Sequence, residues 1–199
     1  LIENDIIGGL RLSGKISTGL KIGFLSMLTN EDKRNEIPSN LNTVLSLNQK
    51  LFNRSALKFL FINRETTKDY DFVDRNYKFN RLIGLEYDLN SIDNVWNGRF
   101  FTYNSFSPLK KENGFSGGVR VKKETREQEI SFEYSYLGDD FRSDLGILRR
   151  IGVSKFCPYY AYKIYPKKGK VNYHRLAYYH WLWFKLNSST ENILENNFL

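Results

Sequence analysis

The stretch EISFEYSYLGDDFRSDLGILRR, residues 129–150, decides the fold that the sequence predicts. Its first eight residues alternate, with Ile130, Phe132, Tyr134 and Tyr136 on one side and Glu129, Ser131, Glu133 and Ser135 on the other. Successive strand side chains point to opposite faces, so this pattern indicates a β-strand with one apolar and one polar face. A turn at 137–141 follows, and we expect 147–151 to continue as a strand.

The preceding residues repeat this pattern. We expect strands at 9–16, 20–28, 42–51, 56–63, 80–89, 96–106, 115–123 and 128–136. Short connections follow the first, third, fifth and seventh of these strands, and longer polar ones follow the second, fourth and sixth. Most of the strands are about nine to eleven residues long, enough to cross a bilayer at a tilt, whereas strands of soluble proteins are usually shorter. The sequence therefore predicts an all-β, antiparallel up-and-down meander of about ten strands, part of a transmembrane outer-membrane β-barrel.

The last part of the chain is rich in aromatic residues. We expect further strands at 159–165 and 170–186, whose aromatic side chains suit the interfacial girdle of a membrane barrel. An aromatic-rich sandwich core is the alternative. Residues 1–186 thus form the predicted barrel segment, and 187–199 form a polar tail or loop of unknown fold. Since no closing strand is evident, we expect an incomplete barrel within a longer protein.

Composition limits the kinds of ligand and partner that the sequence predicts. The chain has 199 residues, a formal net charge of +8 and one cysteine. Its Lys and Arg are spread along the sequence and form no basic stripe, so nucleic acid is not an expected partner. His174 and His180 share a strand face but lie about 20 Å apart at ~3.3 Å per residue, too far for one metal ion. We expect no metal site and no cofactor.

The polar faces of the expected strands carry charges of both signs. The residues predicted to face the lumen are Arg11, Lys15, Lys21, Lys58, Glu86, Asp88, Arg99, Arg120, Lys122, Glu129 and Glu133. In a barrel they would line a watery interior or anchor a plug. In a sandwich they would form the solvated side.

Two other groups are candidate binding residues. Asp139, Asp140 and Asp144 in the turn could bind a ligand or calcium, could form a glycosidase pair, or could serve the backbone of the turn. Glu129 and Glu133 lie about 13 Å apart along a strand, farther than the ~5–9.5 Å of a glycosidase pair. Trp96, Trp181 and Trp183 would be sugar-stacking platforms if the chain were a soluble sandwich. The sequence favours a non-enzymatic role.

Four stretches also resemble a known family: GGLRLSGKISTGLKIGFLSMLT (8–29), NTVLSLNQKLFNRSALKFLFINRET (42–66), FNRLIGLEYDLNSIDNVWNGRFFTYNSFSP (79–108) and YLGDDFRSDLGILRR (136–150). They are similar to the C-terminal region of Bacteroidota outer-membrane proteins that carry an N-terminal family-9-type carbohydrate-binding domain. That region is a domain of unassigned function, thought to be a β-barrel. The resemblance spans Gly8 to about Lys170 and implies no catalytic residues.

These observations lead to one expected function and two alternatives. We expect a segment of a bacterial outer-membrane barrel, in contact with membrane lipid, acting as a pore, an anchor or a component of an uptake complex. The resemblance implies a link to glycan or nutrient handling at the cell surface, with glycan and other outer-membrane uptake or assembly proteins as partners. The alternatives are a soluble β-sandwich that binds carbohydrate and a glycan hydrolase.

Overall fold

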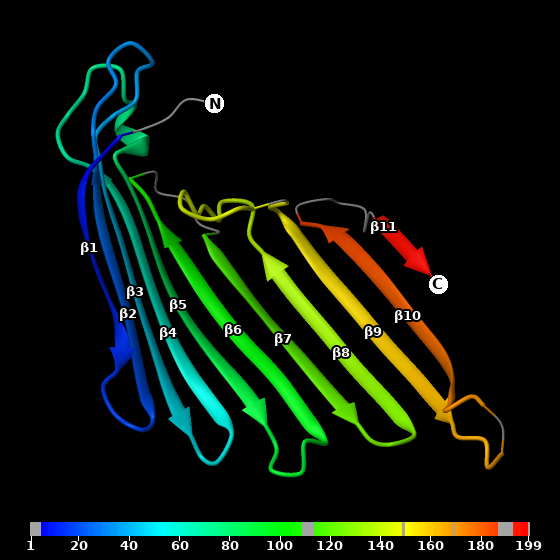
Figure 1. Cartoon of the computed structure of the whole chain (residues 1–199). Coiled ribbons are helices and arrows are strands. Elements are labelled where there is room, and N and C mark those ends of the chain that lie inside the picture. Colours follow the sequence, from blue (N-terminus) through cyan, green and yellow to red (C-terminus); the bar gives the residue numbers. More distant parts are fainter. Residues whose placement is uncertain (1–4, 109–113, 149, 169, 187–192, 199) are drawn as a thin grey trace.

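The chain folds into one antiparallel sheet of eleven strands in sequence order (Figure 1). The computed structural model describes residues 5–108, 114–148, 150–168, 170–186 and 193–198, the last range as backbone only. The strands are β1 (Ile6–Lys15), β2 (Leu20–Thr29), β3 (Asn40–Leu51), β4 (Ser55–Thr66), β5 (Phe79–Asn90), β6 (Trp96–Phe106), β7 (Phe115–Glu124), β8 (Gln128–Leu137), β9 (Val153–Ile164), β10 (His174–Lys185) and β11 (Ile193–Phe198). A short 3-10 helix, η1 (Arg75–Tyr77), precedes β5.

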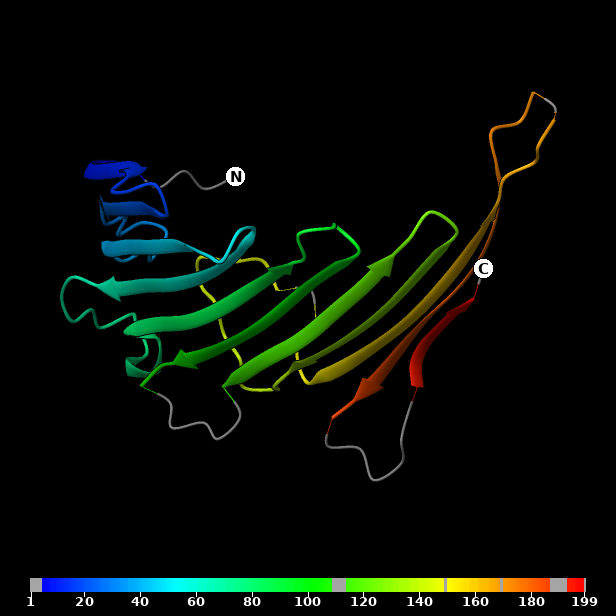
Figure 2. The same cartoon turned by 90° about the horizontal axis from the view of Figure 1, so that it is seen from below.

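Every strand pairs with its neighbours in sequence, and the sheet curves into a trough (Figure 2). The prediction of an all-β up-and-down meander is therefore confirmed. Within the described ranges no pairing joins β1 to β11, so the sheet is open and its two edge strands each pair on one side. β11 lies in the segment 187–199, for which we predicted no strand, and pairs with β10 between His180 and Phe184.

Long and short connections lie at opposite ends of the strands, as the sequence predicts (Figure 1). The turns after β1, β3, β5 and β7 gather at one end, and the longer loops after β2, β4 and β6 at the other. The turn after β5 contains Asn94 at φ 61°, and asparagine is among the few residues that adopt this left-handed conformation readily. The chain thus reverses tightly at one end and leaves room for larger loops at the other.

The largest departure from the sequence-based prediction lies between β8 and β9. Residues 147–151 are not a strand, and β9 begins at Val153 rather than at Tyr159. Residues 138–152, which we call the inner loop, leave the sheet and return to it at one point. At this point Gly152 adopts φ +67° and donates to the Gly138 carbonyl at 3.3 Å. A loop with adjacent ends that packs on its own protein is an Ω-loop, and the apolar residues Leu145, Ile147, Leu148 and Ile151 belong to it.

The two faces of the sheet differ in what covers them. The described residues contain five buried apolar side chains, Leu82, Phe141, Val153, Cys157 and Ala161, all on the face that carries the inner loop, which we call the inner face. The opposite, outer face exposes large apolar side chains such as Leu85 (46%) and Phe132 (42%). A sandwich needs a second layer to cover an apolar face, and the described chain forms a single sheet. The described residues thus form one sheet and no β-sandwich.

In the described part of the chain, no helix has the length and apolarity needed to span a bilayer.

Candidate functional site

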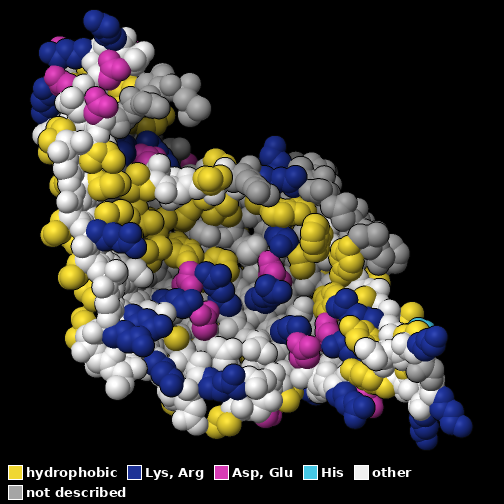
Figure 3. All heavy atoms as spheres, in the orientation of Figure 1, with side chains coloured by type: hydrophobic (Ala, Val, Ile, Leu, Met, Phe, Trp, Pro, Cys, Tyr) yellow, Lys and Arg dark blue, Asp and Glu magenta, His cyan; other side chains and the backbone are white. Residues whose placement is uncertain are grey.

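The inner face gathers the charged side chains of the sheet (Figure 3). The cross-strand register places every residue predicted to face a lumen on this face, from Arg11 and Lys15 on β1 to Glu129 and Glu133 on β8. Lys15 lies directly opposite Lys21, so two like charges meet near the edge formed by β1. The alternation that the sequence shows strand by strand therefore becomes one continuous polar surface.

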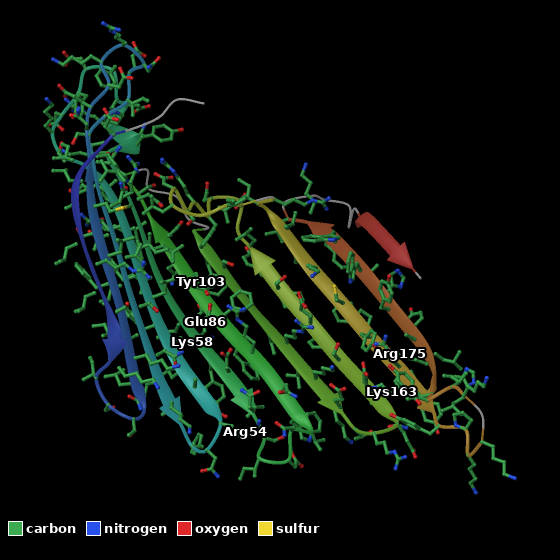
Figure 4. All side chains as sticks on the ribbon, in the orientation of Figure 1. Arg54, Lys58, Glu86, Tyr103, Lys163 and Arg175 are labelled. Atoms are coloured by element: carbon green, nitrogen blue, oxygen red, sulfur yellow. The ribbon has the colours of Figure 1, made fainter. Side chains whose placement is uncertain are left out.

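Glu86 is the centre of a first group of charges, across β4, β5 and β6 (Figure 4). Its carboxylate accepts hydrogen bonds from Tyr103 and, at 2.6 Å, from Arg99. Lys58 on β4 lies 3.7 Å from Glu86 and 2.5 Å from Asp88. Tyr103 reaches Glu86 because its ring lies over Gly84, where a Cβ atom would come within 2.1 Å of the ring.

A second group of charges links β7, β8, β9 and β10. Glu133 lies 2.9 Å from Lys155 and 3.8 Å from Arg120. Glu129, buried to 7% exposure, pairs with Lys163 and with Arg175 at 3.2 Å (Figure 4). Both carboxylates are thus neutralised across strands, and for the buried Glu129 this pairing offsets the cost of burying a charge.

The inner loop is fixed to the inner face by a polar clamp. The amide of Asn80, on β5, donates to the Arg142 carbonyl at 3.2 Å and accepts from the Asp144 N–H at 3.0 Å. The Arg142 N–H donates to Ser105 Oγ at 3.1 Å. The Asp144 carboxylate is held by both nitrogens of the Arg142 fork, at 2.5 and 2.8 Å, and by Arg64 at 2.7 Å. Asp144 therefore positions the loop, and its charge is already compensated.

The other aspartates of the turn do not form a metal site with it. Among the described side chains there is no cluster of three or more His, Cys, Asp or Glu that could hold a metal ion. Asp139 lies against Gly152, where an added Cβ atom would come within 3.2 Å of the Asp139 Cβ. Asp140 occupies the same turn. These residues shape the entry to the inner loop.

The three candidate tryptophans lie on different faces. Trp96 pairs with Lys123 on the outer face, and the Lys123 ammonium lies 5.6 Å from its ring. Trp181 and Trp183 line the inner face, with the Lys155 ammonium 5.8 and 5.7 Å from their rings. A single stacking platform built from all three is therefore absent.

Two hollows open on the inner face. One, of about 610 Å³, lies between the inner loop and the sheet and is lined mainly by apolar and aromatic side chains, including Phe101, Phe141 and Trp183. The other, of about 420 Å³, lies over β7–β10 and is lined by Arg120, Lys122, Lys155, Arg175, Tyr159 and Trp181, with Glu129 and Glu133. Lys155 and Trp181 line both, so the two hollows adjoin.

Sequence reasoning missed several residues of this surface. Lys155, Tyr159 and Lys163 lie four residues apart and therefore share one face of β9. Strand alternation predicts this face if the strand begins at Val153. Asn80 and Arg64 carried no local signal, because their partner Asp144 lies 64 residues from Asn80 and 80 (144 − 64) from Arg64. Strand pattern finds the face, but not the loop that docks on it.

Beyond the ends of the strands, the long loops hold an ion pair of their own. Glu31, in the loop after β2, lies 2.7 Å from the Lys68 ammonium in the loop after β4. The Lys68 hydrogen bond lowers the pKa of Glu31 below its ordinary 4.5, and in return Glu31 raises the pKa of Lys68. The pair ties neighbouring loops together.

Comparison with known proteins gives one match. Residues 3–198 match a family described as a domain of unknown function (DUF5916). No curated protein and no solved structure matches the chain. The match agrees with the resemblance in one respect, that the function of the domain is unassigned.

Proposed function

The chain belongs to this family of domains of unknown function (DUF5916), and we propose that it forms part of the wall of a transmembrane outer-membrane β-barrel. The polar inner face lines a water-filled passage, and the outer face meets lipid. In this role the protein is a pore or a component of an uptake complex at the surface of a bacterial cell. The glycan or nutrient link implied by the resemblance to Bacteroidota proteins belongs to this proposal.

The observation that carries the proposal is the division of charge between the two faces. In β1–β10 the outer face holds three charged side chains, Glu65, Arg81 and Lys123, each within three residues of a strand end. Between them runs a band of Leu, Ile, Val, Phe and Tyr that nothing in the described chain covers. An exposed apolar surface of this extent marks an interaction site, and one bounded by polar strand ends suits a bilayer.

Strand length supports the same reading. The strands β1–β10 have 10 to 12 residues, and a tilted strand crosses a bilayer with about 9–11 residues. Unpaired edges are not stable in hydrocarbon. The proposal therefore requires further strands that pair with β1 and β11 and close the wall.

The alternative functions have less support. A carbohydrate-binding module stacking sugars on Trp96, Trp181 and Trp183 needs these rings on one surface, and Trp96 lies on the other face. A hydrolase needs a carboxylate pair available to substrate. Glu86, Glu129, Glu133 and Asp144 each lie within 4 Å of at least two cations.

Membrane fractionation of the full-length protein that contains this chain tests the proposal. After alkaline carbonate washing we expect it to stay in the outer-membrane fraction and to require detergent for release. Its electrophoretic mobility should change on boiling, as closed barrels unfold only with heat. Recovery from a washed extract without detergent would overturn the proposal.

A further inference from the structure

The inner face has a surplus of positive charge. In β1–β10 it carries thirteen Lys and Arg and five Asp and Glu, which leaves a surplus of eight positive charges. The cations are Arg11, Lys15, Lys21, Lys50, Lys58, Arg64, Arg99, Arg120, Lys122, Lys155, Lys163, Arg175 and Lys185. The carboxylates are Glu86, Asp88, Glu124, Glu129 and Glu133.

Each of these carboxylates is paired with at least one of the cations, so the surplus of eight is what remains after this pairing. Glu124 lies 2.6 Å from Lys122 and 3.5 Å from Lys163, and the other four are paired as described above. Arg120 approaches Glu133 at 3.8 Å with a side chain that is 61% exposed. Its guanidinium therefore remains open to a solute on the inner face.

From this geometry we infer that the inner face selects small anionic solutes, which bind in the hollow of about 420 Å³ over β7–β10. Four cations, Arg120, Lys122, Lys155 and Arg175, surround this hollow, against two carboxylates, Glu129 and Glu133. Guanidinium groups bind carboxylate and phosphate through paired hydrogen bonds. A cleft whose lining carries a net positive charge also concentrates anions before they bind.

The wall of the same hollow suits a solute with a ring. Tyr159, Tyr179 and Trp181 line it beside the cations, and aromatic faces offer flat apolar contact. The adjoining apolar hollow under the inner loop can take an uncharged part of the solute. The ligand class is thus a small organic anion, such as a cyclic carboxylate or an acidic sugar. This inference rests on the proposed function, since it names the solutes of the same passage.

Ion selectivity of the full-length protein in a planar bilayer tests the inference. With a tenfold KCl gradient we expect a reversal potential whose sign shows that chloride permeates more readily than potassium. Arg120→Gln should lower the permeability ratio of chloride to potassium by about twofold or more. Lys123→Gln is the matched control: it removes one positive charge from the same strand, but on the outer face, and should leave the ratio unchanged. A cation-selective conductance, or equal effects of both variants, would overturn the inference.

A second measurement reads the inner face without conductance. The protein is placed in nanodiscs, and its tryptophan fluorescence is compared with that of a variant carrying both Trp181→Phe and Trp183→Phe. The difference between the two signals comes from these two rings. We expect iodide to quench that fluorescence more strongly than caesium does, and D-glucuronate to reduce the iodide effect more than D-glucose or D-glucosamine. Iodide preference without conductance would reject the passage and keep the anion site. Equal quenching by iodide and caesium would reject the anion site even in a conducting protein.

Discussion

Lys122 and Lys123 are neighbours in sequence and lie on opposite faces of β7. Lys122, on the inner face, pairs with Glu124 at 2.6 Å in a network that reaches Lys163 and Glu129. Lys123, on the outer face, lies beside the ring of Trp96 close to the strand end. A lysine side chain thus joins a network of ion pairs on the inner face, whereas on the outer face it occurs close to a strand end. The middle of the outer face carries no charged side chain in β1–β10, whereas charged side chains extend across the inner face.

The largest expected effect comes from placing a charge in the middle of the outer face. Leu45→Arg, halfway along β3, should destabilise the membrane-inserted protein by about 2–4 kcal/mol, because a cation at the bilayer midplane loses its hydration. Urea unfolding of the full-length protein in liposomes measures this. Ser46→Arg is the matched control on the inner face, and it should cost much less. Equal costs at the two positions would mean that the faces do not differ as described.

Two glycines, one on each face of the sheet, allow the inner and outer faces to be compared by adding a methyl group. Gly84→Ala should destabilise the protein by about 1–3 kcal/mol, because its Cβ would meet the Tyr103 ring at 2.1 Å. The ring would have to move, and Tyr103 would lose its hydrogen bond to Glu86. Gly14→Ala, on the outer side of β1 with nothing within 4 Å of an added Cβ, should be close to neutral. The two variants can be compared by the same unfolding experiment, and a neutral Gly84→Ala would show that Tyr103 does not cover this glycine.

The sequence predicted the strands better than the loop between β8 and β9. The predicted bounds of the first eight strands lie within three residues of the observed ones, because each strand shows its own alternation. The stretch 147–151 was predicted to be a strand because it contains apolar residues, but Ile147, Leu148 and Ile151 lie in the inner loop and stay exposed. What fixes this loop is a contact from Asp144 to Asn80, 64 residues away, and no local pattern encodes such a contact.

The candidate site divides in the same way. All the residues predicted to line a lumen share the inner face, whereas Asp144 belongs to the loop's attachment and lies between two arginines. The tryptophans lie on different faces because Trp96 directly precedes Asn97, an inner residue of β6, and successive strand residues point to opposite faces. Which face a residue takes follows from strand parity, but what it touches depends on the loop and on register.

Releasing the inner loop should have a smaller, local effect. Asn80→Ala removes both hydrogen bonds that hold Arg142 and Asp144, and a lost buried polar partner costs about 1–3 kcal/mol. Limited proteolysis of the full-length protein should then cut within 138–152 more rapidly. Asn104→Ala, on the outer face of β6, should leave the cleavage rate unchanged. An unchanged rate in Asn80→Ala would contradict the clamp.

The smallest expected effect is a titration outside the apolar band. Because Lys68 lowers the pKa of Glu31, this ion pair stabilises the loops at and above pH 4.5 and is lost as the pH falls through the lowered pKa. The carboxyl carbon signal of Glu31 should titrate below 4.5 in the wild type and nearer 4.5 in Lys68→Met. Identical midpoints in the two proteins would show that the loops do not make this contact.

The measurement that tests the central claim most directly is a residue-by-residue scan of solvent exposure along β8. Single cysteines would replace residues 130–135 in turn, in full-length protein free of other cysteines and carrying Cys157→Ala, and would be spin-labelled in liposomes. Oxygen, which concentrates in lipid, should relax labels at 130, 132 and 134. A water-soluble nickel complex should relax those at 131, 133 and 135. Nickel access at all six positions would contradict the account, because it would place both faces of the sheet in water.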